Sequence, residues 1–242
     1  MTQDKILKIG MVVAMDKEIT PFLQTDGKLI KKEITCGHEV VFYSLKGKEL
    51  ILIKSGIGEI QASSATSILI GVYGCNLILN FGVCGSLVDD IGILNACVVK
   101  GVVHYDFDLS AIDNLLVGQY PDCDSIVIKT DDRLRELALS VNSELKEVVV
   151  GSADKFVADE NIKKSLVENF NVQVCDMECA GILITANKAK VPCLILKAVS
   201  DGKGGQEEYF KRVKSASLVY IETLLKLLEI LFQSLIWKTI ML

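Results

Sequence analysis

The sequence has no excess of basic residues, and this absence argues against one class of partner. Its 242 residues contain 26 Lys and Arg against 31 Asp and Glu, so the formal net charge is −5. Proteins that bind a nucleic-acid backbone need a basic surface that attracts its phosphates. Nucleic acid is therefore a poor candidate partner for this chain.

The chain also lacks the ligand patterns that mark many metal sites. Its eight cysteines form no CxxC pair. Cys175 and Cys179 are four residues apart, but a zinc site would need two further ligands, and only two histidines are present. His104, Asp106 and Asp108 lie in an extended segment, where successive side chains need not converge on one ion. We expect no metal site, and we interpret the cysteines as buried reduced thiols.

Two further absences concern targeting and domain organisation. The first ten residues, MTQDKILKIG, carry charges where a signal peptide would need an apolar core, which predicts a cytoplasmic protein. No linker rich in Pro, Gly or Ser divides the chain, so we expect a single domain over residues 1–242. The apolar tail over residues 224–242 contains Lys226, Glu229 and Lys238 and is marginal in length for a bilayer. We expect a core or oligomer-interface helix there, without membrane association.

What the sequence does contain is a regular alternation of short apolar strands with helical segments, which predicts the α/β class. The predicted strands are Ile6–Ala14, Leu29–Thr35, Glu39–Leu45, Glu49–Ile53, Leu77–Phe81, Ala96–Val103, Val148–Val150 and Cys193–Val199. The predicted helices lie within 19–23, 60–72 and 131–141, with one long helix from about residue 207. Residues 113–124 have the composition of a loop.

Two glycine-rich segments follow predicted strands. Ser55-Gly56-Ile57-Gly58 leads into a helix, and Gly82-Val83-Cys84-Gly85-Ser86 follows the strand Leu77–Phe81. Neither is a complete dinucleotide-binding fingerprint, because the third glycine is missing. In open α/β sheets, however, ligands bind beyond the carboxyl ends of the strands. Together with Glu18 and Asp201, which also follow strands, the two turns predict one shared site.

The stretch from Val174 to Asp201 has the pattern of an acidic turn, a short helix and a buried strand that ends on a carboxylate. Asp176 and Glu178 stand at the start of the helical run. An acid near a helix start, such as Asp16, Glu18 or Glu178, is commonly a solvated residue favoured by the helix dipole. Asp201 is different, because a carboxylate after a buried strand is costly unless it is partnered or protonated. The stretch is therefore suited to acid–base chemistry on a small molecule.

Several motifs, in this order, resemble those of the 5′-methylthioadenosine/S-adenosylhomocysteine nucleosidases in the nucleoside phosphorylase superfamily. They are A-M-D-K-E at 14–18, K-S-G-I-G at 54–58, N-F-G-V-C-G at 80–85, D-M-E-C-A-G at 176–181 and A-V-S-D at 198–201. The pairing of the last two motifs is the most specific. The resemblance implies a three-layer α/β/α fold with a mixed central sheet, nucleoside phosphorylase-like, and a homodimer.

The resemblance further implies hydrolysis of the N-glycosidic bond between adenine and a 5′-thio-substituted ribose. Asp201 matches the acid that protonates N7 of the leaving adenine, which needs a proton as the bond breaks. Glu18 matches the base that activates the water attacking C1′. Glu178 matches the carboxylate that binds the ribose hydroxyls. We expect no metal or organic cofactor, because these steps need only side chains.

The same resemblance implies the remaining contacts of the nucleoside substrate. Met177 would lie against the ribose, Phe156 would stack on adenine, and the main chain at Val157 would bind its Watson–Crick edge. Other matching positions line or close the 5′-alkylthio pocket, and Leu109 and Ile112 do so across the dimer interface. The further candidate binding residues are Met15, Ile57, Val83, Ser200, and either Tyr209 or Phe210 as a cap.

Departures from the family pattern leave two alternatives open. Phe81 and Val83 occupy positions where small hydroxyl residues are usual, and Lys197 stands where an arginine is common. One alternative is a nucleoside-binding member without catalysis, although Glu18 and Asp201 are intact. The other is a phosphorylase, but phosphate needs cationic partners and the first loop supplies Glu18 in place of an arginine. The 5′-substituent stays open among methylthioadenosine, S-adenosylhomocysteine, 5′-deoxyadenosine and aminodeoxyfutalosine.

Overall fold

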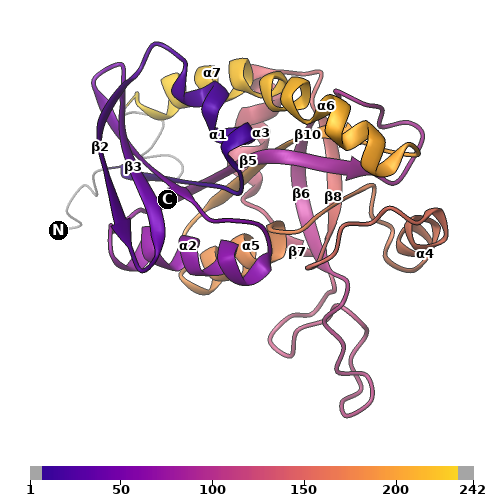
Figure 1. Cartoon of the computed structure of the whole chain (residues 1–242). Helices are drawn as coiled ribbons and strands as arrows, with labels where there is room; N and C mark the ends of the chain where they lie inside the picture. Colours follow the sequence, from indigo (N-terminus) through magenta and orange to yellow (C-terminus); the bar gives the residue numbers. More distant parts are fainter. Residues whose placement is uncertain (1–6, 234–242) are drawn as a thin grey trace.

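A computed structural model describes residues 7–233 and shows a mixed β-sheet between two layers of helices (Figure 1). The ten strands in this part of the chain follow the order β10-β6-β8-β9-β5-β1-β4-β3-β2, and β7 pairs with β6. Because β10 also pairs with β5, the strands β5, β9, β8, β6 and β10 close into a ring. The predicted three-layer α/β/α class with a mixed sheet is confirmed.

The strands and helices have well-defined bounds. The strands are β1 Ile9–Val13, β2 Lys28–Thr35, β3 His38–Leu45, β4 Lys48–Lys54, β5 Leu77–Ser86, β6 Ala96–His104, β7 Ile128–Lys129, β8 Lys146–Ser152, β9 Val174–Asp176 and β10 Cys193–Asp201. The helices are α1 Asp16–Leu23, α2 Glu59–Gly71, α3 Asp132–Val141, α4 Glu160–Phe170, α5 Cys179–Lys188, α6 Gly205–Val219 and α7 Ile221–Leu231.

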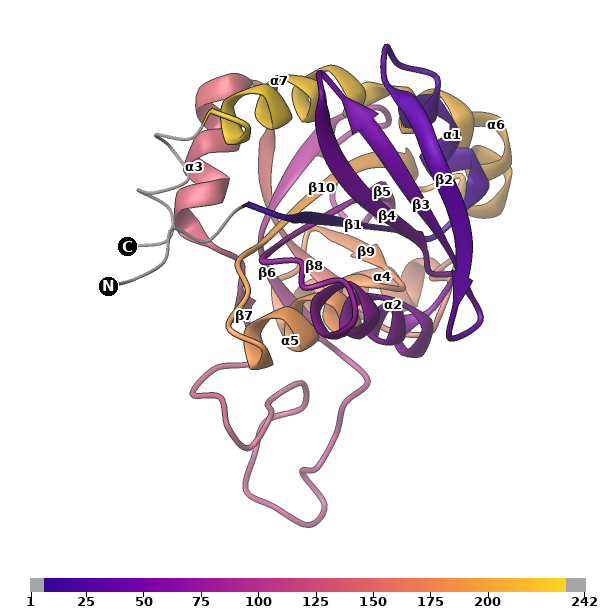
Figure 2. The ribbon, with the colours of Figure 1, turned by 90° about the vertical axis from the view of Figure 1, so that its left-hand side faces the viewer.

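Each face of the sheet has its own hydrophobic core. Helices α1, α3, α6 and α7 cover one face, where Phe22, Leu134 and Leu227 belong to the same buried cluster. Helices α2 and α5 lie side by side on the other face, where Ala65 and Leu183 belong to a second cluster. Figure 2 shows the long segment between β6 and β7 extending away from this body, beyond α5. The catalytic candidates lie between these layers, at the sheet.

Strands β5 and β10 are the most deeply buried pair in the sheet. They run parallel, and nearly every residue in both is buried. A strand covered on both faces is expected to have an almost continuous apolar sequence. Asn80, Lys197, Ser200 and Asp201 interrupt that pattern while remaining buried. Such residues are costly without hydrogen-bond or charge partners, so their surroundings locate the functional part of the fold.

The predicted glycine turn at residues 82–86 is wrong, because β5 continues through it to Ser86. The strand persists since β10 pairs with it from Cys193 to Asp201. The glycines serve another purpose. A Cβ atom at Gly82 would lie 2.6 Å from Glu18 Oε1, and one at Gly85 would lie 3.1 Å from Asp201 Oδ2. A side chain at Gly82 would clash with Glu18 and one at Gly85 would crowd Asp201, because both carboxyl groups approach the main chain there.

The predicted single helix from about residue 207 is also wrong, because the chain divides it into α6 and α7 at Tyr220. Tyr220 is fully buried, with its ring 5.4 Å from that of Phe81, and this contact fixes the junction. Leu224, Leu227, Leu228 and Leu231 are buried as predicted for a core helix. Residues 234–242 of the predicted tail lie outside the described residues. Within residues 7–233, no helix meets the length and apolarity of a membrane span.

The contact between helices α2 and α5 generates a test of the fold. A Cβ atom at Gly181 in α5 would lie 2.3 Å from the main-chain oxygen of Glu59. We predict that Gly181→Ala lowers the free energy of unfolding by about 1–3 kcal/mol, because the two helices must separate. Urea denaturation measures the effect.

Gly71→Ala is the matched control for this test. Gly71 ends α2, and a Cβ atom there meets open space. Alanine is the better helix former, so this variant should keep or increase stability. Equal urea midpoints for the two variants would contradict the constraint at Gly181.

Candidate active site

The three acids predicted for the site are all buried, and each comes from a different element. Glu18 lies in the first turn of α1, Glu178 at the N-cap of α5, and Asp201 at the end of β10. Burial raises the pKa of the Tyr209 hydroxyl, and so do the negative charges of these three carboxyl groups. The fold therefore brings the three acids together around one region beside Tyr209.

Glu18 is held by the main chain. Its Oε1 accepts the N–H of Val83 at 2.8 Å, and its Oε2 accepts the N–H of Met15 at 3.0 Å. The second bond is half of a capping box, in which the third helical residue reaches back to the N-cap. Burial raises the pKa of Glu18, while the charge of Lys197 and these two N–H groups oppose that rise. A base with a raised pKa is suited to accepting a proton near neutral pH.

Asp201 lies where β10 ends against β5. Its Oδ1 accepts the hydroxyl of Ser200 at 2.7 Å. Burial raises the pKa of Asp201 to about 6, although the Ser200 hydrogen bond and the charge of Lys163 lower it. A carboxyl group in this range can hold a proton in mildly acidic solution and release it during a reaction.

Glu178 occupies the N-cap position of α5, yet its carboxylate caps none of the helix N–H groups. Two other residues cap the helix. Asp176 accepts the N–H of Cys179 at 3.2 Å, and the hydroxyl of Ser152 accepts the N–H of Ala180 at 3.2 Å. Glu178 Oε1 instead accepts the N–H of Gly58, at 3.1 Å. Its second oxygen is thereby left for a ligand.

Lys197 and Asp176 form a buried ion pair between β10 and β9. Lys197 Nζ lies 2.8 Å from Asp176 Oδ2, and both side chains are at most 2% exposed. Burial disfavours the charge on Asp176, but Lys197 and several hydrogen bonds outweigh that effect, so the pKa of Asp176 is lowered. The charge of Lys197 also favours the ionised form of Glu178, but it does not outweigh the opposing effects. Burial and the charge of Asp176 raise the pKa of Glu178 to about 7.

Aromatic side chains and a thioether form a cluster beside these acids, made of Met15, Phe156, Tyr209 and Phe210. Tyr209 donates its hydroxyl to Met15 Sδ at 3.4 Å, and its ring lies 5.7 Å from that of Phe156. Phe210 contacts Tyr209, with ring centroids 5.5 Å apart, but is 63% exposed. Lys17 lies over the Tyr209 ring. Of the two predicted caps, Tyr209 is the one that lies among the acids.

The other predicted binding residues differ in how deeply they are buried. Val83, Ser200 and Val157 are buried, and Met177 is partly buried beside Glu178. Ile57 precedes Gly58 and is exposed. Val83 and Ser200 bond to Glu18 and Asp201, Met177 precedes Glu178, and the role of Val157 stays a prediction.

Leu109 and Ile112 are not brought to the acids within this chain. They belong to the segment between β6 and β7, which extends away from the body of the molecule (Figure 2). Ile112 is 84% exposed. His104 anchors the base of this segment, with Nδ1 2.8 Å from the Tyr120 hydroxyl and Nε2 2.9 Å from Asp106 Oδ1. Their predicted role across a dimer interface stays a prediction.

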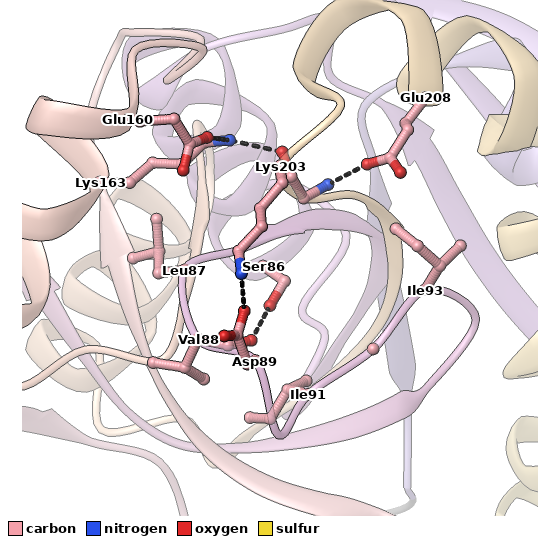
Figure 3. Close-up of a pocket in the computed structure, with 12 residues that line it drawn as sticks. Ser86, Leu87, Val88, Asp89, Ile91, Ile93, Glu160, Lys163, Lys203 and Glu208 are labelled. Atoms are coloured by element: carbon pink, nitrogen blue, oxygen red, sulfur yellow. Dashed lines mark hydrogen bonds and ion pairs between the residues drawn. The ribbon is translucent and has the colours of Figure 1, made fainter.

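A cleft of about 200 Å³ is lined by the segment that follows β5 together with residues of α4 and the start of α6 (Figure 3). Its lining includes Ser86, Asp89, Lys163, Lys203 and Glu208. Lys203 pairs with Asp89, and Lys163 donates to the carbonyl of Gly202. None of the three buried acids lines this cleft. Gly202, which lines the cleft, directly follows Asp201. The cleft is therefore a neighbour of the candidate active site and does not contain its acids.

Sequence reasoning missed the partners that support the acids. The sequence places Asp176 at the start of a helical run, but it gives no sign that Asp176 is the buried partner of Lys197. Glu59 and Ser152 were not singled out, although Ser152 lies between Glu59 and Asp176. The available signal was weak: a glutamate directly after Gly58, at the start of a helix. Among the described residues, no three His, Cys, Asp or Glu side chains form a group that could hold a metal ion.

Comparisons with known proteins show which proteins the chain resembles. The chain is 34% identical over 208 residues to the aminodeoxyfutalosine nucleosidase of Campylobacter jejuni, covering 84% of this chain and 90% of that protein. It is 30% identical over 231 residues to the 5′-methylthioadenosine/S-adenosylhomocysteine nucleosidase of Shewanella pealeana, covering 91% and 99%. The native futalosine hydrolase structure of Helicobacter pylori matches with a TM-score of 0.88 and 31% identity, covering 93% and 98%.

The fold, the buried acids and the nucleosidase names of these relatives define an enzyme of the N-glycosyl hydrolase class. Residues 8–232 match the family model described as the Phosphorylase superfamily. The chain belongs to that superfamily. This confirms the family resemblance found in its motifs.

The Lys197–Asp176 pair generates a test of what holds the site together. Lys197→Met would leave Asp176 buried without its cation, and removing one member of such a pair typically costs about 3–5 kcal/mol. We predict a loss of unfolding free energy of that order, measured by urea denaturation.

Lys188→Met is the control for this variant. Lys188 pairs with Asp122 at 2.9 Å, but both side chains are largely exposed, and water screens such pairs. This variant should unfold like the wild type. A Lys197→Met protein as stable as the wild type would show that the buried pair is not a structural requirement.

Proposed function

We propose that this enzyme hydrolyses the N-glycosidic bond of 5′-substituted adenosines and releases adenine. The observation that carries the proposal is the convergence of Glu18, Glu178 and Asp201, all buried, beside Tyr209. All three acids have raised pKa values, and Glu178 is held by the N–H of Gly58, which matches the needs of this reaction. The nucleosidase names of the relatives support the same chemistry.

Asp201 would act as the acid that protonates N7 of adenine. The departing base is a poor leaving group as an anion, and a positioned acid typically contributes about 10²–10⁴ in rate. Ser200 orients the carboxyl group through Oδ1, which leaves Oδ2 for the substrate. Gly85 allows the close approach of Oδ2 to β5, so the acid has a fixed position.

Glu18 would orient the attacking water and accept its proton. Its two main-chain hydrogen bonds fix the carboxylate plane, and Lys197 opposes the effect of burial by favouring the ionised form. Glu178 would accept hydrogen bonds from the ribose hydroxyls and stabilise the positive charge that develops on the sugar. Met177 adjoins Glu178 and would contact the ribose.

Two departures from the family pattern are compatible with catalysis. Phe81 points into the core, with its ring 5.6 Å from Phe22 and 5.4 Å from Tyr220. Val83 serves Glu18 through its main-chain N–H, which any side chain would leave in place. These contacts favour an active enzyme over a nucleoside-binding protein without catalysis.

Water is favoured over phosphate as the nucleophile. Phosphate binding needs cationic groups that are not already engaged. Lys197 is paired with Asp176, Arg135 pairs with Glu147 on the surface, and Arg212 is exposed on α6. An ionised Glu18 in the path of the nucleophile would also repel an anion.

The 5′-substituent would lie beside Met15, Ile57 and Tyr209, which would form the mouth of the site. This mouth is apolar and aromatic, which fits an alkylthio or similar group. The relatives are named for three substrates with different 5′-substituents, and all three belong to the class proposed here. Comparing kcat/KM for methylthioadenosine and aminodeoxyfutalosine would assign the preference.

We further propose a homodimer that completes this mouth. Ile57 and Ile60 near the mouth and Ile112 and Leu116 in the extended segment are large apolar side chains with more than half of their surface exposed. A second copy of the chain would cover them. Leu109 and Ile112 would then reach the partner's 5′-pocket, as the family resemblance implies.

Adenine release tests the proposed reaction directly. The wild type should release adenine from methylthioadenosine without added phosphate. Asp201→Asn should lower kcat by about 10²–10⁴, because the amide cannot donate the proton. The change removes no volume, and a urea melt checks that folding is intact. Unchanged adenine release by Asp201→Asn, or a strict requirement for phosphate, would refute the assignment.

The pH dependence of kcat/KM gives a second prediction. Asp201 must carry its proton in the free enzyme, and its pKa is raised to about 6, chiefly by burial. We therefore expect kcat/KM to fall as pH rises through about 6. At low pH the activity should fall again, because Glu18 must be ionised. A steady increase of kcat/KM from pH 6 into the alkaline range would contradict this assignment.

A further inference from the structure

The hydroxyl group of Ser152 lies at hydrogen-bond distance from two carboxyl oxygens but has only one proton to donate. It lies 2.5 Å from Asp176 Oδ1, and it also forms a short hydrogen bond with Glu59 Oε1. The same oxygen accepts the N–H of Ala180. A serine hydroxyl has one proton, which can serve one of the two carboxyl oxygens. All of these atoms are buried, so a second proton must belong to one of the carboxyl groups.

Asp176 is not the group that carries this second proton. Its Oδ2 is paired with Lys197, and both of its oxygens lie within 3.3 Å of the Cys179 N–H. These contacts all stabilise the ionised form, and the pKa of Asp176 is lowered accordingly. Ser152 therefore donates its proton to Asp176.

Glu59 has the opposite surroundings. It is buried, its Oε2 accepts the N–H of Gly181, and within the described residues no basic side chain lies at ion-pair distance from it. Asp176 and Glu178 are nearby negative charges that disfavour a charge on Glu59. Burial, together with these charges, raises the pKa of Glu59 to about 8. A protonated Oε1 would complete the chain of donors from Glu59 to Ser152 to Asp176.

We propose that Glu59 is a positioning residue that carries a proton at neutral pH and fixes Glu178 for contact with the ribose. Glu59 begins α2, and its carboxyl group binds Ser152 and the first turn of α5. Gly58, the residue before it, donates its N–H to Glu178. The first turns of α2 and α5 are thus joined at two adjacent points. A neutral Glu59 also spares Glu178 a further negative neighbour.

The groups that face Glu59 determine how it titrates. The nearest are Asp176 on β9, with Glu178 and Cys179 at the start of α5. Asp154, after β8, accepts the main-chain N–H of Glu59, and Tyr105 and Tyr120, on the segment that follows β6, are more distant. The cation among these described residues is Lys197 on β10, which acts through Asp176. The acidic members oppose ionisation of Glu59. Loss of its proton at alkaline pH would place a further charge beside Glu178 and weaken ribose binding.

Infrared spectroscopy of the full-length protein tests the proton without reference to activity. The difference spectrum between wild type and Glu59→Gln at neutral pH should contain the carbonyl band of a neutral carboxylic acid. The band should disappear as the pH rises through about 8. A difference spectrum that shows an ionised carboxylate at neutral pH would overturn the proposal. This result is independent of the proposed function, which fails separately if wild type releases no adenine.

Kinetics test the positioning, which rests on the proposed reaction. Glu59→Gln keeps both hydrogen bonds and should retain kcat/KM, whereas Glu59→Ala strands buried groups and should lose about tenfold or more. The substrates are methylthioadenosine and its analogue lacking the 3′-hydroxyl. Glu59→Ala should reduce the preference for the hydroxylated substrate, because Glu178 is no longer held. Equal losses on both substrates, or equal losses in both variants, would overturn the positioning role.

Discussion

The site depends on a shortage of positive charge in a buried space. Lys197 pairs with Asp176, and the same ammonium group also faces Glu18 and Glu178, while Glu59 lies near the charge of Asp176. Several buried carboxyl groups cannot all ionise beside one cation, because desolvation and mutual repulsion oppose it. Their proton affinities therefore separate: the pKa is lowered in Asp176, raised in Glu18, and raised to about 7 in Glu178 and about 8 in Glu59. Acid–base chemistry near neutral pH needs such a separation.

Main-chain N–H groups stabilise the buried carboxyl groups in place of additional cations. N–H groups of Val83 and Met15 hold Glu18, and that of Gly58 holds Glu178. These donors are fixed by strands and helix ends, so the carboxyl groups need little further ordering when a substrate binds. Glycine at 82 and 85 lets two acids approach β5 closely, which explains why a deeply buried strand lacks side chains at those points. The ring formed by β5 and β10 with their neighbours keeps these donors in place.

Much of the fold follows from local sequence patterns, but the supporting interactions do not. The α/β class, the hairpins β2–β3–β4 and the buried face of α7 were predictable, because apolar periodicity reports which face of an element is covered. The continuation of β5 through Gly82 was not, because the pairing with β10 overrides the local tendency of glycine to end a strand. The division at Tyr220 likewise depends on packing against Phe81. Glu18, Glu178 and Asp201 were identified through motifs, whereas the Lys197–Asp176 pair and the Glu59–Ser152 contact join residues far apart in the chain.

The central claim is that the buried acids direct a water molecule at the sugar while a proton is delivered to the departing base. Reaction in isotopically labelled water, with the sugar product reduced by borohydride as it forms so that its C1 oxygen cannot exchange with solvent, followed by mass spectrometry, examines this most directly. The label should be found in the hydroxyl group at C1 of the free sugar, whether or not phosphate is present. A sugar product without the label, or a sugar 1-phosphate formed when phosphate is supplied, would contradict it.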